Sequence, residues 1–244
     1  MYLRRLIIEA PRLRTFGTGQ GAFWSFPLTD TKFDWWDLSG VTTIGASAWQ
    51  GHNPDGGSDM SYGGSAKAPA SGNLELPSMR ALNETSLNNM AKVEGISLGG
   101  KDKATTVTNI CANALTSDPS LKRLTLHAAA DITVGATPFA SGQTPTEIVF
   151  TGPAPTSETA FANLLARVAA AETKPVRIYA SVLQEGWETA PYIDHSPTAE
   201  ERAEAPGERV IGVYRGGASA PQGKALVIYR KSRFDAPATI IILR

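Results

Sequence analysis

The chain has 244 residues, of which 42% are hydrophobic, so it is long enough for one large domain or two small ones with a sizeable core. Its 23 lysines and arginines balance its 23 aspartates and glutamates, which argues against a nucleic-acid partner or an anionic membrane surface. A single cysteine excludes an internal disulfide, and no apolar run is long enough for a membrane-spanning helix, so we expect no membrane insertion.

The N-terminal segment MYLRRLIIEAPRLRTF contains arginines but only a short apolar run, so we expect no signal peptide in it. Either the protein stays inside a cell, or the chain is the trimmed part of a longer one. Leu3, Leu6 and Ile8 look like the end of a repeat that precedes the first full one. Leu13 and Phe16 look like the beginning of the next repeat.

The segment FWSFPLTDTKFDWW, at residues 23–36, concentrates six aromatic side chains in 14 positions. One interpretation is that alternate members such as Phe33 and Trp35 are buried, while the others close the N-terminal end of the fold. The other is that Trp24 or Trp36 is exposed and stacks on a sugar or a partner, since exposed aromatic side chains favour recognition. The candidate binding residues are Trp24, Trp35 and Trp36.

A spaced apolar pattern recurs through the middle of the chain. Its first half has an apolar residue, a second one three positions later, and an apolar anchor five positions after that. The complete copies are Val41, Ile44 and Trp49; Met79, Leu82 and Leu87; and Val107, Ile110 and Leu115. Degenerate copies end at the anchors Phe23, Phe139 and Phe161. Successive anchors are 22 to 38 residues apart, and most intervals fall in or near the range of leucine-rich repeats.

A second motif follows the anchors, with apolar residues at positions x, x+3 and often x+5. Its copies are Val93, Ile96 and Leu98; Leu121, Leu124 and Leu126; Ile148 and Phe150; and Ile178. The last two positions alternate as in a short strand, so we expect these strands to pair in parallel along one wall. Ile44, Leu82 and Ile110 would then occupy equivalent positions in successive units. Residues 51–75, rich in glycine and serine, predict an insert loop.

The segment VTNICANALTSDPSLKRLTL at residues 107–126 resembles the leucine-rich repeats of bacterial surface antigens called BspA-like, and GVTTIGASAW at residues 40–49 is similar to their first half. VRIYASVLQEGWETA at residues 176–190 is similar to the terminal strand of that family. The resemblance covers about residues 3–190, although three anchors carry Trp or Leu where the family has Phe. It implies an α/β or β-rich solenoid over residues 1–193, a cell-surface or secreted location, and a host or matrix protein or glycan as partner.

The C-terminal part has a different composition. Residues 194–209 are polar and charged, which predicts a solvated connector or a short helix. Three segments rich in Val, Ile and Tyr follow at residues 210–214, 224–230 and 238–244. We expect a small three-stranded antiparallel meander over residues 210–244, whose apolar last strand must pair with a sheet or a partner.

No coherent catalytic set is evident. His52, His127 and His195 lack a metal-type spacing, and Cys111 has no second cysteine near it, so we expect no metal and no cofactor. Asp194 beside His195 could orient a base, but a surface turn is the simpler interpretation. The oxygen-bearing side chains of the insert do not follow a calcium-binding order.

Three hypotheses follow. The first is a non-catalytic protein- or glycan-binding or adhesion module, rather than an enzyme. The second is a structural or receptor-binding subunit of a larger assembly, such as a phage-like tail appendage, which an obligate trimer would favour. The third is a degenerate glycan-active enzyme, which needs paired carboxylates; Glu147 and Glu158 are the nearest candidates. The ligand, the binding face and the oligomeric state stay open.

Overall fold

The computed structural model describes residues 7–16, 35–45, 72–87, 93–100, 105–115, 120–139, 145–165, 176–181, 185–216 and 225–230. This part of the chain is rich in short strands that pair mainly in parallel, with few helices, which confirms the predicted β-rich class. The strands are β1 (Ile8–Glu9), β2 (Thr15–Phe16), β3 (Trp36–Asp37), β4 (Thr43–Ile44), β5 (Gly72–Leu76), β6 (Ala81–Leu82), β7 (Val93–Leu98), β8 (Val107–Ile110), β9 (Arg123–Leu126), β10 (Ala128–Val134), β11 (Glu147–Phe150), β12 (Arg177–Ser181), β13 (Arg209–Tyr214) and β14 (Ala225–Arg230). The helices are α1 (Glu158–Leu165) and α2 (Ala199–Ala203).

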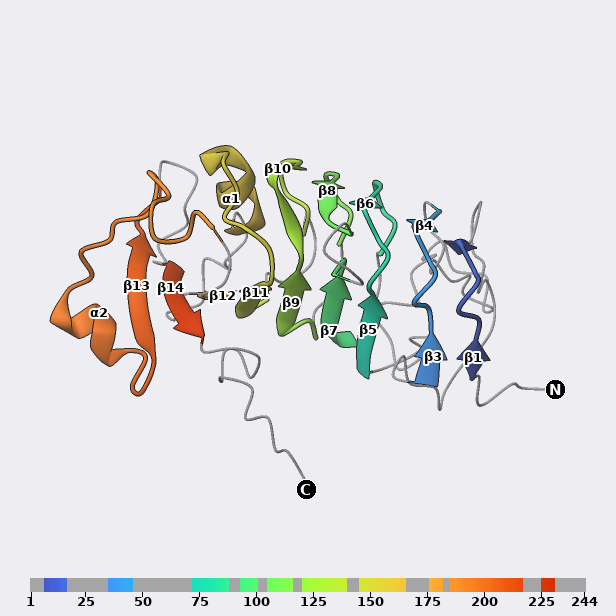
Figure 1. Cartoon of the computed structure of the whole chain (residues 1–244), viewed down its shortest axis with the longest axis horizontal. Helices are drawn as coiled ribbons and strands as arrows, with labels where there is room; N and C mark the ends of the chain where they lie inside the picture. Colours follow the sequence, from blue (N-terminus) through green and yellow to red (C-terminus); the bar gives the residue numbers. More distant parts are fainter. Residues whose placement is uncertain are drawn as a thin grey trace, which may run out of the picture.

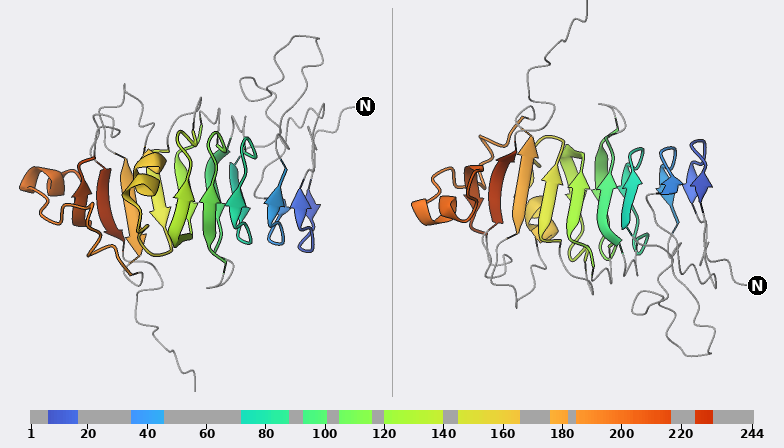
Figure 2. Two further views of the ribbon diagram at one scale, coloured as in Figure 1. Left: turned by 90° about the horizontal axis from the view of Figure 1, so that it is seen from above. Right: turned by 90° about the horizontal axis from the view of Figure 1, so that it is seen from below.

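Seven strands form the largest sheet, in the order β13-β14-β12-β11-β9-β7-β5, in which only the β13–β14 pair is antiparallel. A three-stranded parallel sheet has the order β10-β8-β6, and the pairs β1–β3 and β2–β4 are parallel. Figure 1 shows the strands following one another along the long axis, from β1 at the N-terminal end to β13 and α2 at the other. The views from above and below agree (Figure 2).

Three nine-residue segments have the same local structure. IEAPRLRTF (8–16), WDLSGVTTI (36–44) and LELPSMRAL (74–82) align without a gap. Each begins in β1, β3 or β5 and ends in β2, β4 or β6. Each turns through a backbone hydrogen bond from its sixth residue to its third, with N···O distances of 2.9, 2.9 and 3.1 Å. The same pattern of apolar residues therefore produces the same strand–turn–strand unit three times.

Apolar side chains occupy matching positions in neighbouring strands, as the spacing predicts. In the seven-stranded sheet, two inward rows are formed by Leu74, Ile96, Leu124, Ile148 and Ile178, and by Leu76, Leu98, Leu126, Phe150 and Ala180. In the three-stranded sheet, Leu82 is opposite Ile110, and Ile110 is opposite Val134. The predicted equivalence of Leu82 and Ile110 is therefore confirmed, while Ile44 is paired with Phe16 in the β2–β4 sheet.

The predicted anchors also line up. Leu87, Leu115, Phe139 and Phe161 are completely buried. Successive anchor segments are joined through the backbone, because Leu87 donates its N–H to the residue before Leu115, and Leu115 donates to the residue before Phe139. Each such buried side chain stabilises the fold by about 1.5–3 kcal/mol.

Threonine hydroxyls add a second set of links between successive segments. In the described part of the chain, five of them donate to a backbone carbonyl 24 to 28 residues earlier, at 2.9–3.3 Å. They belong to Thr42, Thr108, Thr133, Thr146 and Thr156. The links repeat at the same interval as the apolar rows, so the two patterns have one structural origin.

Two strands escaped the sequence interpretation. Trp36 lies in β3 and Leu74 in β5, each with its side chain in the core. The predicted insert loop of residues 51–75 is therefore wrong at its end, because residues 72–75 already belong to β5.

The predicted C-terminal meander is also wrong. β13 and β14 do form an antiparallel pair, but β14 has β12 on its other side in a parallel pairing. Both edges of β14 are occupied, so no third meander strand can pair with it. The hairpin instead extends the seven-stranded sheet, and the predicted strand at residues 238–244 lies outside the described residues. The predicted short helix within residues 194–209 is present as α2.

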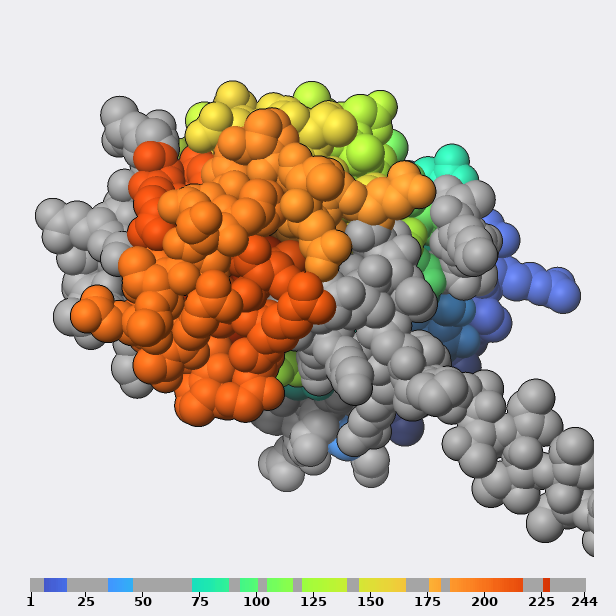
Figure 3. All heavy atoms as spheres, turned by 60° about the vertical axis from the view of Figure 1, so that its left-hand side comes forward, coloured from blue at the N-terminus to red at the C-terminus, as the bar shows by residue number. Residues whose placement is uncertain are grey.

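Aromatic side chains fill the core towards the C-terminal end. Phe161 of α1 lies between Phe150, Tyr192 and Tyr214, with ring centroids 6.3, 5.0 and 5.1 Å away. Trp187 is buried beside Phe150 and donates its Nε1–H to the carbonyl of Gly152 at 3.2 Å. Figure 3, which brings this end forward, shows the segments after β12 spread over it. None of the described helices is long and apolar enough to cross a membrane.

Candidate functional site

The open side of the parallel strands presents a regular array of side chains. Side chains alternate along a strand, so residues next to the inward rows point to the opposite side of the sheet. On the seven-stranded sheet these are Asn73, Glu75, Ser97, Arg123, Thr125, Glu147, Val149, Arg177, Tyr179, Leu226 and Ile228. Ile7 and Glu9 flank Ile8 of β1, and Trp35 and Asp37 flank Trp36 of β3, in the same way. We call this whole set the outward face.

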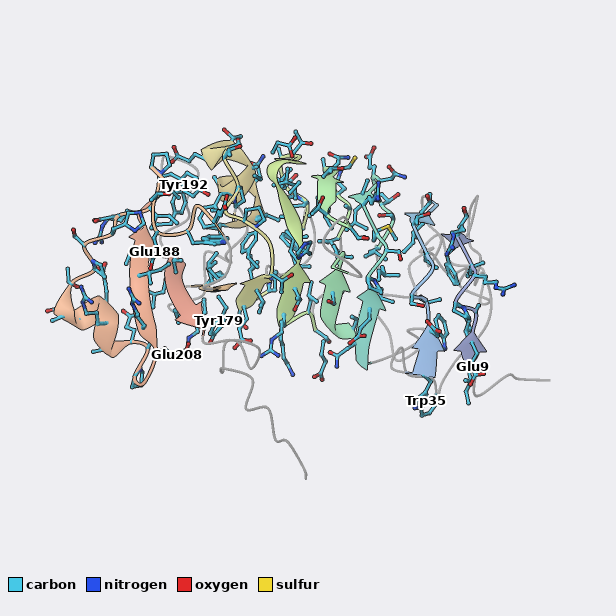
Figure 4. All side chains as sticks on the ribbon, in the orientation of Figure 1. Glu9, Trp35, Tyr179, Glu188, Tyr192 and Glu208 are labelled. Atoms are coloured by element: carbon cyan, nitrogen blue, oxygen red, sulfur yellow. The ribbon has the colours of Figure 1, made fainter. Side chains whose placement is uncertain are left out.

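At its N-terminal end the outward face combines apolar and acidic side chains. Glu9 is opposite Asp37 in the β1–β3 register, and both are exposed. Ile7 is 55% exposed, and Trp35 is half-buried against the core. Figure 4 shows Trp35 near Glu9 at this end of the molecule. Glu75 has the same place in the third nine-residue segment as Glu9 and Asp37 have in the first two.

The middle of the outward face carries paired charges. Arg123 on β9 donates from both Nε and Nη2 to Glu147 Oε2 on β11, at 2.8 and 2.6 Å. At the border of the face, Lys122 Nζ lies 3.5 Å from Glu94 Oε2. Such exposed pairs contribute about 0–1 kcal/mol to stability, so their main effect is to neutralise the surface.

Towards the C-terminus the outward face becomes apolar and covered. Tyr179, Leu226 and Ile228 are buried on this side of the sheet. They form a second apolar cluster with Val210 and Val213 of β13 and with Ala205, which follows α2. The open part of the outward face therefore extends from β1 to about β11.

An ion network ties α2 to the end of β13. Arg215 donates to Asp194 Oδ2 at 2.8 Å and to both carboxylate oxygens of Glu201 at 2.6 and 3.1 Å. The hydrogen bond from Arg215 lowers the pKa of Asp194 below its ordinary value, and the bond from the Ser196 N–H adds to this effect. Glu201 is only 3% exposed and also accepts from Thr198 N at 2.8 Å in a capping box. The arrangement holds a short helix in place rather than presenting a reactive group.

The histidines and the cysteine have structural contacts. His195 places Nδ1 3.2 Å from the carbonyl oxygen of Ile211 and Nε2 3.3 Å from that of Ala190. His127 lies with Nδ1 3.0 Å from Thr151 Oγ1. Cys111 is half-buried and its sulfur accepts from Asn109 Nδ2 at 3.2 Å. His52 lies outside the described residues.

The two carboxylates considered for glycoside chemistry have separate surroundings. Glu147 is paired with Arg123, whereas Glu158, the first residue of α1, accepts a hydrogen bond from the Tyr214 hydroxyl at 3.3 Å. Burial, together with the charge of Glu158, raises the pKa of Tyr192 well above its ordinary value. The Tyr192 hydroxyl donates to the carbonyl of Pro155 at 2.6 Å, so it acts as a fixed donor in the core.

The three predicted binding tryptophans fare differently. Trp36 is 6% exposed, with its ring centroid 6.4 Å from that of Phe16, so the interpretation that it is exposed is wrong. Its spacing explains the burial, since Phe33, Trp36 and Leu38 follow the x, x+3, x+5 motif of the other inward strands. Trp35 stands next to the inward row and keeps part of its surface accessible. Trp24 lies outside the described residues.

The carboxylates of the outward face were not recognised from the sequence. Glu9, Asp37 and Glu75 share one position in the three gap-free segments, which is the signal that identifies them. Within the described ranges, no group of three or more His, Cys, Asp or Glu residues is placed to hold a metal ion. Comparison of the chain with protein-family models, with curated proteins and with solved structures gives no match.

Proposed function

We propose that the chain is an irregular leucine-rich-repeat solenoid of the BspA-like type. It acts as a non-catalytic protein- or glycan-binding module on a bacterial surface or after secretion. The solenoid is supported by the apolar rows and by the threonine links that recur at intervals of 24 to 28 residues. Stacked repeats produce long faces that suit the recognition of extended ligands.

The observation that carries this proposal is the outward face. Its open side chains come from successive parallel strands in fixed register, so neighbouring strands present them about 4.8 Å apart. A ligand that crosses several strands can contact each of them. The backbone beneath them is already paired, so the face needs little ordering on binding.

The test introduces bulk and charge in the middle of the outward face. Thr125 is opposite Ser97 and Val149 on the neighbouring strands. We expect Thr125→Arg to abolish binding to any ligand found by screening the chain against purified extracellular-matrix proteins and a glycan array. Circular dichroism and the melting temperature check that the variant is folded.

Asp131→Arg serves as the matched control, because Asp131 is exposed on β10 in the three-stranded sheet. It should leave binding unchanged. A ligand that binds the Thr125→Arg variant as tightly as the unmodified chain would show that the outward face is not the binding surface. A screen without any ligand would argue against a binding module altogether.

A further inference from the structure

We infer that the N-terminal part of the outward face, formed by Ile7, Glu9, Trp35 and Asp37, binds a basic peptide segment of a partner protein. The inference rests on the proposed function and specifies the chemistry of its ligand.

The apolar half of this patch consists of Ile7 and Trp35. Ile7 is 55% exposed, and it is the exposed large hydrophobic side chain of the described residues. Trp35 is half-buried against the core, which restricts its motion while leaving surface for contact. A lysine or arginine side chain can cover such a surface with its alkyl stem and place its cation against the indole ring.

The acidic half determines the sign of the partner. Glu9 and Asp37 are opposite each other on adjacent strands, and Glu75 follows in the next segment. In the described chain, the outward positions of β1, β3 and β5 hold three carboxylates and no cation. Neither Glu9 nor Glu75 forms an ion pair within the described residues, whereas Glu147 in the middle of the face is paired with Arg123. Charge complementarity therefore favours a cationic ligand over an acidic or neutral one.

The dimensions suit an extended peptide. Adjacent strands are about 4.8 Å apart, and alternate side chains of an extended chain lie about 6.8 Å apart on one side. A peptide that crosses β1 and β3 can therefore place one basic side chain between Glu9 and Asp37 and another over Trp35. A neutral sugar could stack on Trp35 but would not use the two negative charges.

The test measures the fluorescence anisotropy of a labelled synthetic peptide of alternating lysine and threonine, with a glutamine–threonine peptide as the neutral comparison. The chain should bind the lysine peptide and not the glutamine peptide. Binding should weaken as salt rises from about 50 to about 500 mM, because the screening length shortens. The double substitution Glu9→Gln/Asp37→Asn should lower the affinity at least about tenfold.

These two substitutions hardly change side-chain volume, and an asparagine at position 37 can still accept the hydrogen bond that Asp37 Oδ1 accepts from Ser39 N. The variant should therefore fold, which circular dichroism verifies. Trp35→Ala should also weaken binding. Arg123→Gln/Glu147→Gln, in the middle of the face, is the matched control and should bind the peptide like the unmodified chain.

Equal affinity of the unmodified chain and Glu9→Gln/Asp37→Asn, or binding insensitive to salt, would overturn the inference. Glycan binding that requires Trp35 but neither carboxylate would assign the patch to a sugar and overturn it as well. If the lysine peptide fails while Thr125→Arg still abolishes binding of a screened ligand, the inference is wrong and the proposed function stands. If neither the peptide nor any screened ligand binds, both are wrong.

Discussion

Single polar side chains in this protein serve mainly to hold the core together. The hydroxyl of Tyr192 lies in the aromatic region near Phe161 and is satisfied by the carbonyl of Pro155. Burial keeps it neutral, since ionisation there would place a negative charge in an apolar environment next to Glu158. The same physics that fixes this side chain makes the fold sensitive to alkaline conditions.

We expect the stability contributed by the neutral Tyr192 hydroxyl to fall as the pH rises above about 10, where tyrosine ionises in the unfolded chain. Its pKa is raised in the folded state, so the contribution is complete below the unfolded value and is lost above it. Tyr192→Phe should lower the free energy of unfolding near neutral pH by about 0.5–1.5 kcal/mol through the lost hydrogen bond. Denaturant unfolding from pH 7 to 11 should show the two proteins converging. A constant difference across this range would contradict the assignment.

At the scale of elements, the short helix α2 depends on contacts outside itself. A helix of this length is not stable alone, because few hydrogen bonds offset the cost of nucleation. Its capping box is formed by Thr198 and Glu201, and Glu201 also pairs with Arg215 just after β13. Asp194 and Val213 exchange two backbone hydrogen bonds of 2.9 Å, which cover part of the free edge of β13. The connector thereby protects an edge strand from pairing with another chain.

Replacing Glu201 by Ala should therefore lower the free energy of unfolding by about 1–3 kcal/mol, because it removes the cap and leaves a buried donor without its partner. The adjacent Glu200 is exposed on the same helix, so Glu200→Ala provides the matched control and should change stability by no more than about 0.5 kcal/mol. Denaturant titration followed by circular dichroism measures both. Equal effects of the two substitutions would show that the network with Arg215 does not hold the helix.

Over the whole molecule, stability depends on contacts between successive segments. Leu82 and Ile110 are 28 residues apart in sequence but directly opposite in register, and both are completely buried. Each segment alone has too few apolar side chains to form a core. Neighbouring segments complete one another, which is the energetic basis of the proposed solenoid.

A double-mutant cycle tests this coupling. Leu82→Ala and Ile110→Ala should each cost about 2–5 kcal/mol, and the pair should deviate from additivity by about 0.5–3 kcal/mol because the two cavities adjoin. Leu82→Ala combined with Ile178→Ala is the control, since Ile178 lies in β12 of the other sheet and its effect should add within about 0.5 kcal/mol. Additivity in the first pair would contradict direct packing between these segments.

Much of the fold could be predicted because it is encoded in local spacing. The motif at Ile96 and Leu98, at Leu124 and Leu126, and at Ile148 places alternate residues on one side of a strand, and this alternation survives any neighbouring sequence. The β3 and β5 strands were missed because aromatic residues around Trp36 resemble a surface cluster. The C-terminal hairpin was misassigned because spacing cannot show which strand lies beside β14.

The candidate site divides in the same way. Trp35 could be proposed from the sequence as an exposed aromatic residue, but Trp36 could not be told from it until the register with Ile8 assigned one side chain to the core. Glu9 and Asp37 are 28 residues apart and gain meaning only when β1 and β3 pair.

By itself the sequence determined the repeated apolar spacing, the parallel class of strands and the inward positions, because side-chain alternation is a property of each short segment. Only the tertiary structure decided which strands are neighbours, that β14 lies between β12 and β13, and that an acidic and aromatic patch forms on the outward face. These features depend on hydrogen bonds and burial between residues far apart in the chain, which no local pattern specifies.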